Sequence, residues 1–597
     1  MLSRSAGPDG DAVHLGERFG LGHTWLRTSA TEGLQPLSLD GRTWLAADAR
    51  LDDRGTLITA LRAHRRDVSA STSDAELVLH SYATWPEHFL DHLAGDFAFA
   101  LWDDGRQRLI CARDQLGTTP LHYARIPGGL LVATSIDALR LHPAVSDDLD
   151  EVAVADFLII GHTQDFGSTM FTDVRRVPPA HTLGWADGQV ELSRYWHFPQ
   201  WRPLLRFGHP QEASDRFGEL LDAATADRIT TDRVVVHLSG GMDSTSIAAS
   251  ATVALRSRGA PSDAVRAMTA VLGGSSGDRE GEFARLVAEA LGVGVDLIDG
   301  STMPPLDPQA APLLVTSEPT PYRRTAFEYE TARVPAAHAP VALSGIGGDP
   351  LLWSSPWYWA EWLAHGQVRR LTRAFGDHVR LFGTRLHPAL RPGLAGLPAR
   401  RAAGTTPLPG WLDAEFVART RALERRPPVR PPAAGLDVRS LSGDPFWTTL
   451  CTRGHPSFTG LPVRFRYPLL DLRLLQFAAA LPPEPWLQNK RILRDATLHR
   501  LPAEVRQRPK APLVEAPLPG HSAAVMERLS AFVRQVPELD RFLDREAVAA
   551  GLTVLGDHPS ARGEIELARP LGLAHWLAHR LRPECLPLPD AAKPPAV

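Results

Sequence analysis

The chain has 597 residues, of which 44% are hydrophobic and 22% are charged, and its formal net charge is −4. This length predicts two to four globular domains, and the weak negative charge excludes the broad basic surface of a nucleic-acid-binding protein. No apolar run approaches membrane-spanning length, and the first residues lack the apolar centre of a signal peptide. The three cysteines, Cys111, Cys451 and Cys585, are too far apart for a metal pair or a disulfide framework. We therefore predict a cytoplasmic protein that binds neither nucleic acid nor a membrane.

Residues 1–200 combine short strand-like segments with a few helices. The segments at 43–46 and 97–102 are apolar and strand-like, and a turn at 103–105 joins the second of them to a strand at 108–112. Helical patterns cover 74–82 and 151–159. This mixture predicts an α+β domain at the N-terminus.

Residues 213–350 alternate between strands and helices. This alternation is typical of a parallel sheet that is covered by helices, in which ligands bind at the carboxyl ends of the strands. The predicted strands are 233–238, 268–272, 295–298 and 341–343, and the predicted helices are 245–254 and 280–291.

A glycine turn follows the first of these strands. It leads into a helix, so its backbone N–H groups and the helix N-terminus form a socket for phosphate. The turn lacks the lysine of the Walker loop, which favours release of pyrophosphate over transfer of a γ-phosphoryl group. An ordinary strand-to-helix turn is the alternative. The predicted ATP-binding residues are Ser239, Gly240, Gly241, Asp243 and Ser244.

A second glycine loop follows the strand at 341–343 and repeats the same order of serine, glycines and aspartate. Its predicted binding residues are Ser344, Gly345, Gly347, Gly348 and Asp349. Asp243 and Asp349 would then hold one Mg²⁺ and the pyrophosphate unit from two strand ends, since Mg²⁺ prefers carboxylate oxygens. The alternative for each aspartate is a helix N-cap.

The rest of the chain is less regular. Residues 385–435 are rich in proline and arginine and predict an extended connection, whose positive charge is more typical of a solvated face than of a binding patch. Residues 444–580 return to helical patterns, and residues 586–597 predict a disordered tail.

Four further segments, 95–103, 112–121, 466–471 and 502–510, resemble the asparagine synthetase superfamily when they are taken together with the two glycine loops. The resemblance implies a glutaminase-like domain of the Ntn-type αββα fold over 1–200. It also implies an ATP-pyrophosphatase synthetase domain over 210–585, with a parallel α/β sheet and a helical C-terminal part. ATP and Mg²⁺ are the implied cofactors. Lys510 is similar to the family's catalytic lysine, and Met268 to Leu272 match the segment that contacts adenine.

The sequence departs from glutamine-hydrolysing members at the N-terminal domain. Those enzymes use a cysteine exposed after Met removal, whereas residue 2 is Leu2, and Asp48-Ala49 replaces the family's Asn-Gly. We therefore expect this domain to make no ammonia. In the second loop, Ile346 stands where asparagine synthetases carry glutamate and β-lactam synthetases carry tyrosine.

These departures resemble the lasso-peptide macrolactam synthetases. That resemblance implies adenylation of an Asp or Glu side chain in a linear core peptide, attack by the peptide's own α-amine, and release of AMP and pyrophosphate. A leader peptidase and a leader-binding protein are the implied partners. Another adenylating amide synthetase, either β-lactam-forming or ammonia-dependent, is the alternative, and a scaffold without catalytic activity is a third.

Several other residues are candidates for contact with substrate or ATP. An apolar cluster after the second loop could line a peptide cavity or belong to a helix core; it comprises Leu351, Leu352, Trp353, Trp357, Tyr358 and Trp359. The segment 317–320, which contains Glu318, could face the peptide. One of Asp278, Arg279, Glu280 and Glu282 could reach ATP or substrate, or these residues could form a helix cap and a solvated face. Tyr467 replaces a glutamate that is common in synthetases, with no role assigned.

Overall fold

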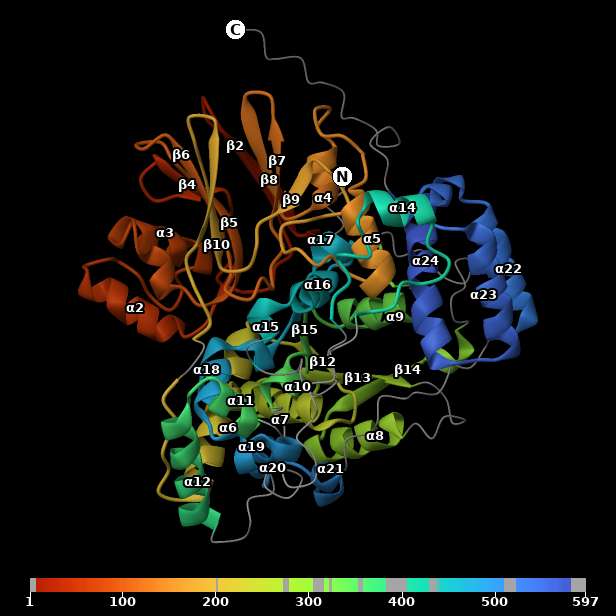
Figure 1. Ribbon diagram of the computed structural model, residues 1–597. Helices are drawn as coiled ribbons and strands as arrows, with labels where there is room; N and C mark the ends of the chain where they lie inside the picture. The colour runs from red at the N-terminus through yellow and green to blue at the C-terminus, as the bar shows by residue number, and fades with distance from the viewer. Residues whose placement is uncertain are drawn as a thin grey trace.

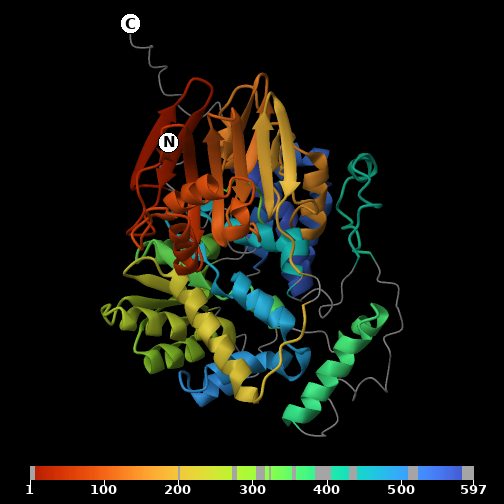
Figure 2. The ribbon, with the colours of Figure 1, turned by 90° about the vertical axis from the view of Figure 1, so that its left-hand side faces the viewer.

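The computed structural model separates into an upper part made mostly of strands and a lower part in which helices surround a second sheet (Figure 1). In the view of Figure 2, the N-terminal strands stand side by side above the second part. The structure describes residues 7–199, 202–271, 279–303, 316–321, 325–352, 358–382, 405–428, 438, 440–508 and 522–580.

The N-terminal part contains three antiparallel sheets. A hairpin joins β1 (Gly10–Leu15) to β2 (Gly20–Trp25). The largest sheet has the order β11-β10-β6-β5-β4-β3, and the third has the order β8-β7-β9. The strands of these two sheets are β3 (Leu37–Ser38), β4 (Thr43–Leu51), β5 (Gly95–Asp103), β6 (Arg108–Arg113), β7 (His122–Ile126), β8 (Gly129–Ala133), β9 (Val174–Arg176), β10 (His181–Ala186) and β11 (Gln189–Arg194).

Strand β5 is apolar on both faces because it is covered on both faces. Phe97 and Phe99 point into a core shared with helices α2 (Arg54–Ala63) and α3 (Asp74–Thr84). Ala98, between them, points into a core shared with the three-stranded sheet. Helices α4 (Ile136–Arg140) and α5 (Glu151–Ile160) cover the far side of that sheet. The layers are therefore helix, sheet, sheet and helix, which confirms the αββα prediction and the predicted strands and helices of this part.

The second part is built on a five-stranded parallel sheet of order β14-β13-β12-β15-β16. The strands are β12 (Val234–His237), β13 (Val265–Val271), β14 (Gly294–Asp299), β15 (Val341–Ser344) and β16 (Arg464–Arg466). The helices that cover it include α6 (Pro210–Arg228), α7 (Met242–Ser257), α8 (Glu280–Leu291) and α9 (Thr325–Ala336). The predicted parallel sheet is confirmed.

The fifth strand was predicted wrongly as part of a helical region. Strand β16 has three residues, and two of them are the buried arginines Arg464 and Arg466. A strand this short, with charged residues at alternate positions, carries no apolar pattern that distinguishes it from a loop.

The order of the strands places the two glycine loops side by side. The chain builds β13 and β14 on one side of β12 and then crosses to build β15 on the other side. His237 at the end of β12 pairs with Ser344 at the end of β15. In open α/β sheets, ligands bind outside the carboxyl ends of the strands at such a reversal of strand order.

The C-terminal helices return to the N-terminal part. Helix α24 (Ala561–His579) packs beside α5, and α22 (Ala523–Arg534) and α23 (Arg545–Asp557) pack on the other side of α24 (Figure 1). Their shared core includes a ring contact between Phe171 and Trp576 at 5.6 Å. The other helices in this half are α10 (Gly348–Leu351), α11 (Tyr358–Ala364), α12 (Val368–Phe382), α14 (Ala414–Arg419), α15 (Ser440–Gly443), α16 (Pro445–Arg453), α17 (Pro456–Thr459), α18 (Leu472–Ala480), α19 (Pro483–Trp486), α20 (Arg491–Ala496) and α21 (Ala503–Gln507).

The predicted connection at 385–435 contains a short helix, α14, and its remainder falls partly outside the described residues. The predicted tail at 586–597 also lies outside them. Among the helices in the described ranges, none is both long enough and apolar enough to cross a bilayer.

Candidate active site

The first glycine turn joins β12 to α7 and is held by its own serines. The Ser239 N–H donates to Ser244 Oγ at 3.0 Å, and the two hydroxyl oxygens also lie 3.0 Å apart. Gly240 has φ +63°, a left-handed conformation that glycine adopts without strain. Helix α7 begins at Met242, so its unpaired N–H groups and positive dipole end lie at the carboxyl end of β12. This arrangement can bind phosphate oxygens.

The second loop packs directly against the first, and glycine makes this contact possible. A Cβ on Gly345 would lie 3.0 Å from the Ser244 nitrogen. A Cβ on Gly348 would lie 2.3 to 2.8 Å from the carboxylate atoms of Asp243. A larger residue at either position would push the two loops apart. The predicted residues of the two loops are therefore neighbours in space.

Lys490 joins the two predicted metal ligands. Its ammonium lies 2.5 Å from Asp243 Oδ2 and 2.7 Å from Asp349 Oδ1. Burial disfavours the charged ammonium, but the two carboxylates outweigh it and raise the pKa of Lys490 above its usual value. Asn489 and Lys490 both have positive φ, +50° and +55°. Non-glycine residues in this conformation cost of order 1–3 kcal/mol each and are concentrated at functional sites.

Lys490 is not among the residues predicted from the sequence, although the composition of the chain carries a signal for it. The chain has only three lysines, at 490, 510 and 593, while arginine supplies nearly all the positive charge. A lysine kept in such a chain suggests a position where a compact ammonium is needed and a planar guanidinium does not substitute. Lys510, the predicted catalytic lysine, lies outside the described residues, and its role stays a prediction.

Arg508 is a second contact to the first turn that the sequence analysis missed. It donates from Nη1 to the Gly240 carbonyl and from Nη2 to Glu280 Oε1, both at 2.9 Å. Its guanidinium also lies 4.2 Å from the centre of the Phe283 ring. Of the acidic candidates near Glu280, Glu282 instead pairs with Arg279 on the exposed surface, and Asp278 lies outside the described residues.

Comparison with protein families assigns both halves of the chain. Residues 216–578 match the family described as asparagine synthase, and residues 2–196 match a glutamine amidotransferase domain. The first match alone covers more than half of the chain. The chain belongs to the asparagine synthase family. Members of this family are ATP-dependent, AMP-forming ligases that make amide bonds.

Individual relatives match over shorter stretches. Asparagine synthetase [glutamine-hydrolyzing] 3 of Bacillus subtilis is 31% identical over 251 residues, which is 41% of this chain and 40% of that protein. Amidase chyE of Penicillium rubens is 31% identical over 243 residues, which is 38% of this chain and 34% of that protein. The matched regions thus span well under half the length of these relatives.

A solved structure of glutamine phosphoribosylpyrophosphate amidotransferase from B. subtilis also matches. It has 18% sequence identity and a TM-score of 0.23, and the match covers 49% of this chain and 69% of that one. This score is too low to support an argument about fold.

In the asparagine synthase domain, the adenine-binding prediction is only partly placed. Met268 lies on β13, opposite His237, with a fully buried side chain. Its carbonyl accepts the Leu238 N–H at 2.8 Å, so the chain itself already uses this group. Leu272 lies outside the described residues. Contact of this segment with adenine stays a prediction.

Of the two interpretations of the apolar cluster, a helix core and a peptide lining, the helix core holds for the residues that the structure buries. Leu351 and Leu352 belong to the main core of the asparagine synthase domain, where they are close-packed against its helices. Tyr358 is buried against Trp362, with 5.0 Å between ring centres, and Trp359 packs on the same cluster. Trp353 and Trp357 lie outside the described residues.

Three further residues singled out in the sequence have structural contacts. Glu318 accepts the Met170 N–H at 3.0 Å and a hydrogen bond from Arg176 at 2.6 Å, so it joins the two parts of the molecule, and its contact with a peptide stays a prediction. Tyr467 is buried and donates to the Cys451 carbonyl at 3.3 Å. Ile346 packs against the main core.

A cavity of about 490 Å³ lies in the amidotransferase-like part. It is lined by strands β2, β4, β5 and β8 and by residues at the start of α17 and on β16. Asp48 Oδ2 accepts hydrogen bonds from His455 Nε2 at 2.8 Å and from Arg464 at 2.9 Å. Burial opposes the charge of Asp48, but Arg464 and His455 hold its pKa well below the usual range. The residue that replaces the family's asparagine is thus tied to the synthase domain.

Proposed function

We propose that the protein is an ATP-dependent amide ligase that activates a carboxylate as an acyl-adenylate. The observation that carries this proposal is the bridge from Asp243 through Lys490 to Asp349 at two adjacent strand ends. A helix N-terminus beside it can hold phosphate oxygens. Within the described residues, the turn offers no lysine of the Walker type, which supports release of pyrophosphate with AMP formation.

Mg²⁺ fits the two carboxylates of this site. Their oxygens are close enough to share one ammonium, and hard carboxylate oxygens are the ligands that Mg²⁺ prefers. Bound there, the ion would neutralise the charge of the pyrophosphate leaving group. Lys490 would then be available to stabilise negative charge that develops as pyrophosphate leaves.

We further propose that the nucleophile is an amine on the substrate itself, as in lasso-peptide cyclases. Two observations support an acceptor other than ammonia made from glutamine. First, the Asp48 carboxylate is hydrogen-bonded to His455 and Arg464. Second, the two described cysteines are buried outside the cavity that Asp48 lines. An α-amine has a pKa of about 8, so part of it is neutral near pH 7 without a dedicated base. The substrate would be a linear core peptide whose Asp or Glu side chain is adenylated.

One assay tests both levels of this proposal. The protein is incubated with ATP, Mg²⁺ and linear peptides that carry a free N-terminus and an internal Asp or Glu. We expect AMP, pyrophosphate and a peptide product that is lighter by one water. The matched control is the same peptide with an acetylated N-terminus, which should form the adenylate and release pyrophosphate without closing a ring.

Other outcomes identify the alternatives. Amidation of free aspartate with ammonia, and no peptide product, would contradict the cyclase proposal and favour an ammonia-dependent synthetase. Ring closure on a small β-amino acid would indicate a β-lactam-forming enzyme. Absence of ATP consumption with every substrate would contradict the ligase proposal and favour a scaffold. A leader peptidase and a leader-binding protein, the expected partners, would be tested by adding them to the same assay.

A further inference from the structure

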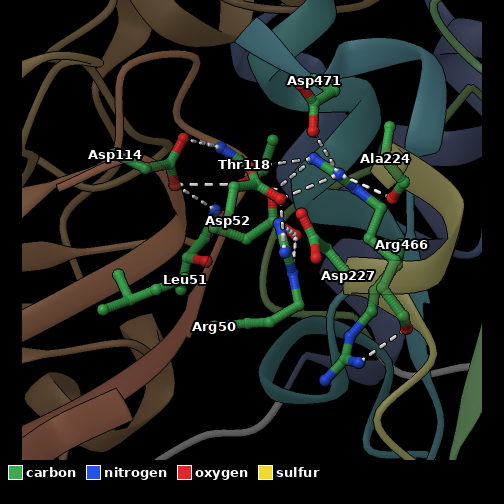
Figure 3. Close-up of polar contacts among 12 residues, drawn as sticks. Arg50, Leu51, Asp52, Asp114, Thr118, Ala224, Asp227, Arg466 and Asp471 are labelled. Atoms are coloured by element: carbon green, nitrogen blue, oxygen red, sulfur yellow. Dashed lines mark hydrogen bonds and ion pairs between the residues drawn. The ribbon is translucent and has the colours of Figure 1, made fainter. Parts of the chain in front are cut away.

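The two parts of the molecule meet at a buried cluster of charges (Figure 3). Arg228, the last residue of α6, donates to Asp52 Oδ1 at 3.1 Å and to Asp471 Oδ2 at 2.9 Å. Asp52 follows β4 of the N-terminal part, whereas Arg228 and Asp471 belong to the synthase domain. The Arg228 side chain is 1% exposed. One arginine therefore links carboxylates from both parts.

The cluster has a defined composition of opposite charges. Asp52, Asp227 and Asp471 lie close enough to share one cation. That positive charge is already supplied, because Arg473 donates to both Asp227 and Asp471 and Arg228 donates to both Asp52 and Asp471. Arginine is suited to this role because its planar fork donates to several carboxylates at once.

Asp471 also determines where the next helix begins. Its Oδ1 accepts the Arg473 N–H at 2.9 Å, so it caps α18. The turn just before it is the 3₁₀ helix η4 (Pro468–Leu470). The Asp471 N–H donates to the Pro468 carbonyl at 3.3 Å. Because Asp471 is bonded to the η4 turn, the hydrogen bond from Arg228 to Asp471 also fixes the position of η4.

Helix η4 packs on the second glycine loop. Gly347 has φ +95°, and a Cβ there would lie 2.4 Å from Leu470 Cδ2. Leu470 thus lies directly against the loop backbone. The next residues are Gly348, which contacts the Asp243 carboxylate, and Asp349, which binds Lys490. A continuous set of contacts therefore runs from Asp52 to the phosphate and metal site.

We propose that Asp52 of the N-terminal part is a positioning residue for the ATP site, because through Arg228 and Asp471 it holds η4 against Gly347 and so sets the place of Asp349. This inference rests on the proposed ATP site and does not depend on the identity of the substrate. It gives the amidotransferase-like part a role that needs no glutamine hydrolysis. The competing explanation is that the cluster only holds the two parts together.

The experiment compares two carboxylates at the same interface. Asp52→Asn weakens the cluster that leads to η4. Asp48→Asn weakens the contacts to His455 and Arg464, which also cross the interface; Arg464 is the first residue of β16 and His455 caps α17, so neither contact runs through Asp471. In Asp52→Asn we expect faster hydrogen–deuterium exchange in residues 344–352, measured without ATP. We also expect a roughly tenfold rise in KM for ATP with a smaller change in kcat, because coupling through packed contacts has effects of this size. In Asp48→Asn we expect wild-type exchange in this loop.

A second variant tests whether the path runs through η4. Leu470→Ala removes the contact to Gly347 and should raise loop exchange and the KM for ATP as Asp52→Asn does. The double variant should be no worse than the more affected single variant, since both act on one contact path. If Asp52→Asn does not fold, Arg228→Lys replaces it, because an ammonium does not reach both carboxylates with the same fork geometry.

The outcomes decide between the two explanations. Equal loss of thermal stability in Asp52→Asn and Asp48→Asn, with loop exchange unchanged in both, would overturn the proposal and leave the cluster as an interface contact only. Additive effects of Asp52→Asn and Leu470→Ala would also overturn it. Because loop exchange is measured without ATP or peptide, a failure of the proposed ligase activity is separable from a failure of this inference.

Discussion

Lys490 is the residue on which the proposed chemistry depends most. Its ammonium lies between Asp243 and Asp349, and its backbone is held in a left-handed conformation. We expect Lys490→Met to lower the rate of pyrophosphate release by about 100-fold or more, the usual cost of removing one transition-state charge partner. Lys490→Arg should not restore the rate, because a guanidinium is wider and planar. A coupled pyrophosphate assay measures both variants, and wild-type rates in Lys490→Met would remove this residue from the mechanism.

Gly348 tests how tightly the two loops must pack. A Cβ at this position would overlap the Asp243 carboxylate, so we expect Gly348→Ala to displace that carboxylate and abolish most pyrophosphate release. The matched control is Gly376→Ala in α12, where an added Cβ meets no atom within 4 Å. That variant should keep its activity and gain up to about 1 kcal/mol of stability, since alanine favours a helix interior over glycine. Equal activity of the two variants would contradict the close packing.

At the scale of elements, α8 and α21 together hold the first glycine turn through one arginine. Arg508 at the end of α21 contacts the Gly240 carbonyl, Glu280 and the Phe283 ring. We expect Arg508→Ala to weaken ATP binding about ten- to a hundredfold, because hydrogen bonds to charged groups contribute about 1.5–3 kcal/mol. The control is Arg279→Ala, which removes an exposed pair with Glu282 and a contact to the Phe283 ring at 4.9 Å but leaves the contact to the Gly240 carbonyl in place. Calorimetric titration with ATP measures the dissociation constants of both variants. Equal constants would show that the Arg508 contacts to the glycine turn are not needed for ATP binding.

At the scale of the whole molecule, the two parts share a core and a charged interface. Helix α24 packs against α5, α22 and α23 pack on α24, and His455 crosses the interface to Asp48. Burial lowers the pKa of His455 to about 4, below the value of 6.5 expected for the unfolded chain. The unfolded chain therefore takes up a proton between pH 6.5 and about 4 while the folded chain does not. The stabilisation is fully present above pH 6.5 and is lost as the pH falls through this window.

This sign gives a measurable pH dependence. We expect the free energy of unfolding to fall by at most about 1.4 kcal/mol per pH unit for this group as the pH drops from 6.5 towards 4. In His455→Gln, which keeps a donor for Asp48 but does not titrate, the dependence should be shallower by about that amount. Denaturant unfolding at pH 7, 6 and 5 measures the slope. Parallel slopes for the two proteins would show that His455 is not the titrating group.

Much of the fold could be predicted because the hydrophobic periodicity of its strands and helices is visible in short stretches of sequence. The strand at 95–103 is apolar at nearly every position, and helix α8 has one apolar face, so both were recognised. Strand β16 was missed because three residues with two buried arginines have no periodicity. The apolar segment beginning at Leu351 was ambiguous, because core packing and substrate lining require the same residue types.

The sequence by itself determined a mixture of strands and helices at the N-terminus, the parallel sheet and the two glycine loops at the strand ends, since strand periodicity and turn chemistry are local properties. The αββα layering was implied by the family resemblance. Only the tertiary structure decided which cations complete the site. Lys490 is separated from Asp243 by 247 positions and Arg508 from Gly240 by 268, and short motifs carry no information about such distant partners. It also decided that Asp52, in a domain expected to make no ammonia, lies on a contact path to the ATP loop. Side chains far apart in the chain become neighbours only when the two parts pack together.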